Sequence, residues 1–242
     1  MPWYLIAVLT VAILAGATAS VVGFGIGSLL TPLLAFRYGM PAAVAAVTIP
    51  HAVATALRCW RLRAAVDRRV LVRFGLLSAA GGLLGALLYT RLGGALLTRI
   101  LGALLILTAA AHLGGLARRW HPHGPLVGLL GFGSGFFGGV AGNQGGLRAA
   151  ALGAFGLAPA AFVATSTATG LLVDAARTPV YLWQAGDLLV RLWPVLTTAT
   201  AGVVVGTLAG ERVLLGLSTE RFGRIVATAI GVLGIWLLAR GA

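Results

Sequence analysis

The sequence predicts an all-α integral membrane protein with about eight transmembrane segments in two internal repeats, the first helix of each repeat being broken at a glycine cluster. Three observations predict this fold. Of the 242 residues, 59% are hydrophobic and 10% are charged, whereas a soluble domain carries about 25% charged residues. The mean hydropathy is +0.99, and long apolar runs recur along the chain. Two glycine clusters recur in matching contexts in the two halves.

The apolar runs define the expected segments, because a helix needs roughly 20 predominantly apolar residues to cross the hydrocarbon core. The expected segments are Trp3–Val22, Ala42–Leu57, Val70–Leu88, Ile100–Leu116, Pro125–Val140, Ala160–Val180, Leu188–Leu208 and Ile225–Leu238. The second is short and contains Pro50 and His51. Ala17-Thr18-Ala19 resembles a signal cleavage site, but no arginine or lysine precedes it. We therefore expect Trp3–Val22 to be a retained helix.

Two pairs of segments indicate an internal duplication. VVGFGIG (21–27) aligns with VAGNQGG (140–146), and GMPAAVAAVTIP (39–50) aligns with LAPAAFVATSTA (157–168). The same alignment places Arg58 on Arg177. A common order of matches at a nearly constant offset predicts a first repeat at 1–117, a short charged connection at 118–124 and a second repeat at 125–242.

The paired glycine clusters are predicted to form a substrate site. Glycine inside a helix costs about 1 kcal/mol relative to alanine, so Gly23, Gly25 and Gly27 should break the first helix, and Gly145 and Gly146 should do the same in the second half. In lipid, a broken helix is tolerated only where protein or a water-filled cavity satisfies the freed backbone groups. Transporters build substrate sites from such helices near the bilayer midplane. The alternative is close helix packing through small residues.

The net charge of +13 comes from arginines that lie between apolar runs. We interpret them as topology signals rather than as a nucleic-acid surface. Two arrangements satisfy the positive-inside rule. In one, the chain crosses eight times from a cytoplasmic N-terminus. In the other, the short pieces after the glycine clusters form re-entrant hairpins, the repeats are inverted, and residues 58–73, 118–119 and 212–224 are cytoplasmic.

Arg148 is the leading candidate for binding an anionic substrate. A charged residue inside a membrane segment costs several kcal/mol and is by default a functional hypothesis. The guanidinium offers five donors in a rigid fork that suits oxyanions. Asn143 and Gln144 precede it and add amide donors, and a helix beginning at Gly145 would direct its positive dipole end toward an anion. The alternatives are an arginine at the membrane edge or one paired with Asp174.

A second polar group occupies residues 165–182. Asp174 and Arg177 are three residues apart, so they share a helix face, and the preferred interpretation is a neutralising pair. Alternatively, Arg177 contacts substrate and Asp174 carries a coupling proton. Thr165 and Ser166 offer hydroxyl donors to substrate, although such residues often bond within membrane helices. His51 is either a second proton carrier or a neutral interhelical hydrogen bonder.

The sequence argues against an enzyme, a metal site or a cofactor. The glycines of 131–146 do not follow a strand in a βαβ unit, as dinucleotide binding requires. No His-Glu-x-x-His motif is present, and the single cysteine, Cys59, offers no metal cluster. His121 and His123 have no acidic or cysteine residue nearby. We therefore predict no catalytic residue, no metal and no cofactor.

The chain resembles the sulfite exporter TauE/SafE family of membrane transporters. The residues that carry the resemblance are GFGIGSLLTPLL (23–34), GGVAGNQGG (138–146) and YLWQAGD (181–187). The resemblance implies transport of small sulfur-containing anions, such as sulfite and organosulfonates, across a bacterial inner membrane. The chain departs from the family pattern at Ile26, which interrupts the first glycine triplet, and at Asn143 and Gln144 in the second. These departures lie at the predicted substrate site.

The predicted function is therefore a transporter that holds a small sulfur-containing anion between the two glycine clusters. Export is the simpler direction, because a negative-inside potential drives an anion outward by about 2.3 kcal/mol per charge per 100 mV. The alternative is a passive anion channel or a carrier of small carboxylates. The expected partners are the small anion and the lipid bilayer, with no nucleic acid. Small-residue faces also allow a homodimer.

Overall fold

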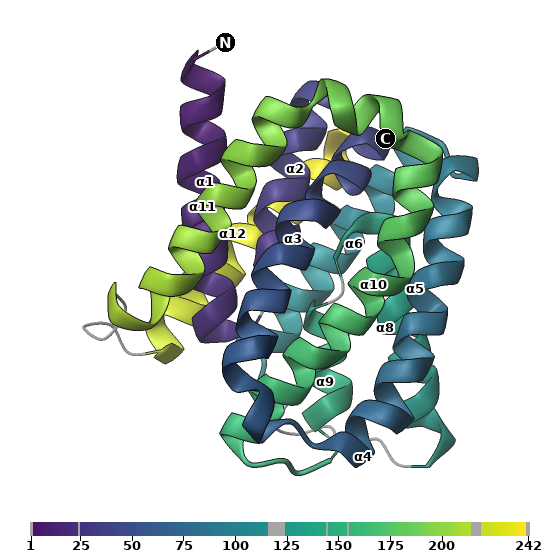
Figure 1. Cartoon of the computed structure of the whole chain (residues 1–242), viewed down its shortest axis with the longest axis vertical. Helices are drawn as coiled ribbons and strands as arrows, with labels where there is room; N and C mark the ends of the chain where they lie inside the picture. The colour runs from purple at the N-terminus through teal and green to yellow at the C-terminus, as the bar shows by residue number, and fades with distance from the viewer. Residues whose placement is uncertain are drawn as a thin grey trace.

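The expectation of an all-α protein is confirmed by the computed structural model, which describes residues 2–23, 25–115, 124–143, 145–153, 155–213 and 219–240. These residues form helices and turns, with no strand among them (Figure 1). The longer helices are α1 (Pro2–Val22), α2 (Ile26–Tyr38), α3 (Met40–Leu62), α5 (Leu76–Leu88), α6 (Gly94–Leu113), α8 (Pro125–Ala141), α9 (Gly145–Gly153), α10 (Pro159–Arg191), α11 (Trp193–Val213) and α12 (Thr219–Arg240). The short α4 (Arg68–Val70) lies between α3 and α5.

Six helical segments of the described chain are long and apolar enough to cross a membrane. They are Pro2–Val21, Met40–Ala65, Arg68–Arg91, Gly94–Leu113, Trp193–Gly210 and Glu220–Arg240. Two of the eight expected segments, Pro125–Val140 and Ala160–Val180, have no counterpart among these six. Helix α8 is apolar but has only 17 residues. Helix α10 has 33 residues, but hydroxyl and charged side chains along its middle lower its hydropathy.

The boundary between α10 and α11 differs from the sequence prediction. A span was expected at Leu188–Leu208, but α10 continues to Arg191, and α11 begins at Trp193. The non-helical backbone of Ala185, at φ −134° and ψ 19°, kinks α10 before its last turns. The polar stretch QAGD (184–187) separates two apolar runs, so hydropathy predicts a loop where the chain is helical on both sides of a kink.

Glycines bring two pairs of parallel helices into close contact. Helix α5 packs along α8, where a methyl group on Gly81 or Gly85 would overlap the carbonyl oxygens of Phe132 and Phe136. Helix α1 packs along α11 in the same way, and a methyl group on Gly206 would overlap the carbonyl oxygen of Ile13. Close packing through small residues is the usual way for membrane helices to associate. Most of the glycines outside the two clusters therefore serve packing.

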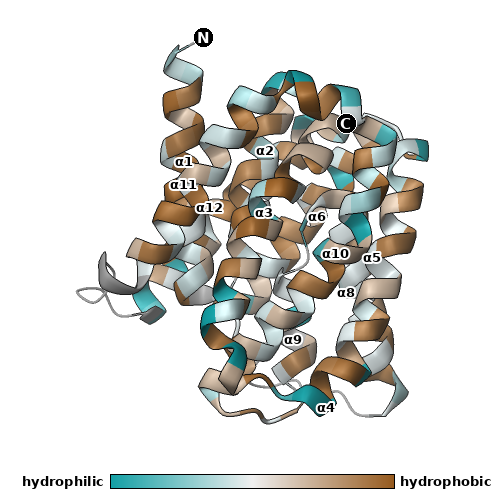
Figure 2. Ribbon diagram, viewed as in Figure 1, coloured by the Kyte–Doolittle hydropathy of each residue, from teal (hydrophilic) through white to brown (hydrophobic). Residues whose placement is uncertain are grey.

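Helices α3 and α10 form the antiparallel centre of the molecule. His51 of α3 contacts Asp174 of α10, and the hydroxyl of Thr165, earlier in α10, bonds the chain beyond α3 at Asp67. Residues 42–47 of α3 are all buried, so this helix is enclosed on every side at that level. Figure 2 shows apolar residues along the outer helices and polar residues at α4. The outer surface suits lipid, and the central pair is shielded from it.

The chain directions place the first helices of the two halves in opposite orientations. Helix α1 runs parallel to α11, and α8 runs parallel to α5. Helix α5 also runs parallel to α10, since Gly75 lies beside Thr169 and Gly82 beside Val173. Helix α11 returns from the end of α10 after the single residue Leu192 (Figure 1). It follows that α1 and α8 point in opposite directions.

Candidate functional site

Each half of the chain contains a helix break at its glycine cluster. Helix α1 ends at Val22, and α2 begins at Ile26; helix α8 ends at Ala141, and α9 begins at Gly145. Three glycines in these breaks have positive φ: Gly23 at 84°, Gly25 at 142° and Gly142 at 70°. L side chains rarely adopt this region. Gly142 also ends α8, since its amide donates to the carbonyl of Gly138 at 3.0 Å.

The two breaks meet in the interior of the protein. A methyl group on Gly27 would overlap the carbonyl oxygen of Gly142, so α2 can approach the second break only because residue 27 has no side chain. Next to this contact, the hydroxyl of Ser28 donates to Oδ1 of Asn143 at 3.5 Å. Residues more than 110 positions apart in the sequence therefore form one site.

A small cavity with about 20 Å³ of water-accessible volume lies at this meeting point. This volume holds about one water molecule, so the walls must move apart to admit a larger anion. The lining residues are Ala19, Gly23, Gly25, Ile26, Gly27, Ser28, His51, Arg58, Gly142, Asn143, Gly145 and Arg148. Most of the predicted substrate residues are in this set. Gln144 was predicted as well, but it lies outside the described residues.

Arg148 reaches the cavity from α9 and is 3% exposed. Its Nε donates to the hydroxyl of Ser166 at 3.0 Å, while its buried Nη1 has no hydrogen-bond partner. Gly170 makes room for this guanidinium, because an added Cβ there would lie 2.9 Å from Nη1. The guanidinium is thus enclosed by protein, and its Nε is bonded to Ser166.

Arg58 is a site residue that the sequence analysis missed. It was interpreted as one of the cytoplasmic topology arginines, but its side chain is buried, lines the cavity and donates from Nη1 to the carbonyl oxygen of Ala19. Its buried Nε has no partner. The available signal was helical spacing, because His51, Thr55 and Arg58 recur on one face of α3.

Amide donors complete the cavity wall. Nδ2 of Asn143 is buried without a partner, and the side chain is 5% exposed. The first hydrogen bond of α2 runs from the amide of Leu29 to the carbonyl of Gly25 at 2.9 Å. The amides of Ile26, Gly27 and Ser28 thus have no acceptor within the helix. Together with the N-terminus of α9 at Gly145, they contribute the positive ends of two helix dipoles.

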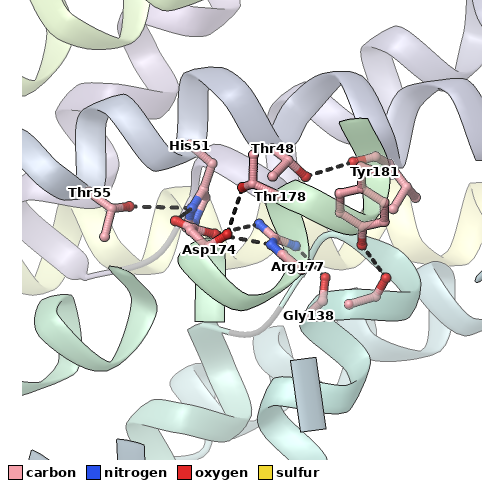
Figure 3. Close-up of polar contacts among 10 residues, drawn as sticks. Thr48, His51, Thr55, Gly138, Asp174, Arg177, Thr178 and Tyr181 are labelled. Carbon is pink, nitrogen blue, oxygen red and sulfur yellow. Dashed lines mark hydrogen bonds and ion pairs between the residues drawn. The ribbon is translucent and has the colours of Figure 1, made fainter. Parts of the chain in front are cut away.

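Asp174 organises a second buried cluster beside the cavity (Figure 3). His51 contacts Oδ2 of Asp174 through Nδ1 at 2.7 Å, and Arg177 donates to Oδ1 from Nε at 3.1 Å and from Nη2 at 2.8 Å. Arg177 also donates from Nη1 to the carbonyl oxygen of Gly138. Asp174 and Arg177 are both 0% exposed. The predicted neutralising pair is confirmed.

The remaining predicted residues lie outside the cavity lining. The hydroxyl of Thr165 accepts a hydrogen bond from the amide of Asp67 at 2.9 Å. Gly146 packs against the side chain of Thr108, where a Cβ would clash. Arg177 and Asp174 are engaged with each other and do not line the cavity. Ser166 acts through Arg148, whose guanidinium it holds. The assignment of these residues to substrate binding or proton coupling stays a prediction.

A multi-pass membrane protein with broken helices around a cationic internal cavity has the architecture typical of a secondary transporter for an anion. The chain belongs to the sulfite exporter TauE/SafE family, whose model matches residues 8–237, nearly the whole sequence. Members of this family are membrane transporters rather than enzymes. No curated protein and no solved structure matches the chain.

Proposed function

We propose that this protein exports a small sulfur-containing anion, sulfite or an organosulfonate, across the bacterial inner membrane. The observation that carries the proposal is a set of three buried N–H groups without partners, at Arg58, Asn143 and Arg148, around one cavity. An unpartnered buried donor costs about 1–3 kcal/mol, and more when it is charged. A small oxyanion supplies acceptors for donors of this kind. Family membership selects sulfur oxyanions among the anions that fit.

Each donor has a distinct role in binding. Arg148 and Arg58 approach from different helices, α9 and α3, so they contact the anion from different directions. The hydrogen bonds to Ser166 and to the carbonyl of Ala19 hold the two guanidinium groups in place before the anion arrives. Asn143 Nδ2 and the amides at the start of α2 add neutral donors. This preorganisation reduces the entropy lost on binding.

The two halves, 1–117 and 125–242, are proposed to be inverted repeats. Arg58 donates to the carbonyl of Ala19, and Arg177 donates to the carbonyl of Gly138. Both residues of the second bond are displaced by 119 positions from those of the first (177 − 58 and 138 − 19). The parallel pairs α1 with α11 and α8 with α5 are exchanged by the same operation. Such repeats support alternating access to a central site.

The same geometry favours one membrane orientation. Helix α3 and helix α11 end on the side of the molecule where α4 lies (Figure 1). This side carries the arginines of 58–73 and those at the start of α12. The re-entrant arrangement likewise places these two groups of arginines on one side of the membrane. The positive-inside rule then places α4 in the cytoplasm and the start of α1 outside. Substrate therefore enters from the side of α4.

The bond between His51 and Asp174 supports a role in coupling. His51 lines the cavity and contacts the carboxylate that neutralises Arg177, so a change in its protonation would reach both the anion site and the buried ion pair. A histidine titrates near neutral pH when unperturbed. We propose that this pair carries the proton coupling.

The test is sulfite efflux from proteoliposomes that contain the purified protein. We expect efflux from wild type and from Arg69→Gln, since Arg69 is exposed in α4, but none from Arg148→Gln. Normal efflux from Arg148→Gln would refute the site. A counterflow measurement with labelled sulfite then separates a carrier from a channel, because only a carrier exchanges external for internal anion much faster than it conducts net current.

A further inference from the structure

The charges of the buried ionisable groups, tyrosines aside, do not balance. Among the described residues they are His51, Arg58, Arg148, Asp174 and Arg177. This set therefore contains one negatively charged carboxylate and three positively charged guanidinium groups. Asp174 is bonded twice by Arg177 and is 0% exposed, so its charge is assigned to that pair. His51 donates to the same carboxylate when it is neutral and then adds no charge.

Among the residues that the structure describes, no carboxylate pairs with Arg58 or Arg148. Their hydrogen-bond acceptors are a backbone carbonyl and a hydroxyl group, both neutral. The two side chains are 7% and 3% exposed, so water screens them weakly. Both line the same cavity, and each has one buried nitrogen without a hydrogen-bond partner. The cavity lining thus carries two positive charges that no described carboxylate compensates, which is costly in a low-dielectric interior.

We propose that the cavity selects small oxyanions with two negative charges over singly charged anions of similar shape. A dianion neutralises both guanidinium groups, whereas a monoanion leaves one buried charge unpaired. The proposal rests on the proposed function and refines its substrate: it favours sulfite, in its fully deprotonated form, over organosulfonates that carry a single charge. Specificity then comes from the penalty for the wrong charge, as well as from attraction to the right one.

Sulfate and methanesulfonate test this proposal, because they share a tetrahedral sulfur and differ by one charge. Binding of each to the purified protein in detergent is measured by calorimetry at constant ionic strength. Sulfite is measured alongside at mildly alkaline pH, where it is a dianion. We expect sulfate and sulfite to bind at least tenfold more tightly than methanesulfonate. In Arg58→Gln and in Arg148→Gln, the ratio should fall close to one.

The lysine variants Arg58→Lys and Arg148→Lys separate charge from hydrogen-bond geometry. Each keeps the positive charge and loses the planar fork, so the preference for dianions should persist at weaker affinity. Arg69→Gln is the control for loss of an exposed arginine. Methanesulfonate binding as tightly as sulfate in wild type, with both weakened in the glutamine variants, would overturn the charge selectivity while leaving the anion site intact. Absence of binding for all three anions would overturn the proposed function itself.

Discussion

Asp174→Asn removes the only carboxylate in the buried cluster and tests whether this residue neutralises Arg177. The guanidinium of Arg177 is 0% exposed and bonds Oδ1 of Asp174 through two nitrogens, at 3.1 and 2.8 Å. The variant keeps an oxygen acceptor of the same size but leaves the guanidinium charge buried without compensation. Breaking a buried ion pair by removing one partner costs about 3–5 kcal/mol.

The expected loss is large enough to measure by thermal unfolding in detergent. For a chain of this length, 1 kcal/mol corresponds to a Tm change of roughly 2–4 °C, so Asp174→Asn should lower Tm by about 6–20 °C. Arg177→Gln should also destabilise, because it leaves the carboxylate unpaired. The double variant Asp174→Asn/Arg177→Gln should be less destabilised than the sum of the two single changes. A Tm within about 2 °C of wild type for Asp174→Asn, or strict additivity, would refute this account.

Three further predictions concern the cavity, the helix packing and the topology. Saturating sulfite should raise the Tm of the wild type, because a ligand at 100 times its dissociation constant stabilises the folded protein by about 2.7 kcal/mol. Arg58→Gln should abolish this rise, and an undiminished rise would exclude Arg58 from the site. Gly135→Ala should destabilise by about 1–3 kcal/mol, because its methyl group would overlap the carbonyl oxygen of Ser78, whereas Gly133→Ala has open space and should be nearly neutral; equal Tm values for these two variants would contradict the packing of α5 on α8. In a Cys59→Ser background, Arg69→Cys should react with a membrane-impermeant thiol reagent only from the cytoplasm and Arg191→Cys only from outside, and labelling of both from one side would disprove the proposed orientation.

Several features were predictable because their signals are local in the chain. Hydropathy over about 20 residues identified membrane segments such as Pro2–Val21 and Arg68–Arg91, whose bounds lie close to the expected Trp3–Val22 and Val70–Leu88. Glycine clusters marked both helix breaks, since the absence of a side chain acts at the residue itself. The pairing of Asp174 with Arg177 followed from a spacing of three residues on one helix.

Other features were set by contacts between distant residues. Arg58 resembles the arginines that follow it in sequence, and only the approach of α1 and α9 to α3 makes it a buried cavity residue. The partner of His51 lies 123 positions away on α10.

The sequence by itself determined that this chain is a helical membrane protein of the TauE/SafE family, because composition, apolar run length and short motifs are properties of neighbouring residues. Only the tertiary structure decided which charged groups are neutralised and which are not. Asp174 pairs with Arg177, while Arg58 and Arg148 line a common cavity that has no carboxylate among its described lining residues. The free energy of a buried charge depends on its distance to other charges and on its exclusion from water, and the three-dimensional fold sets both.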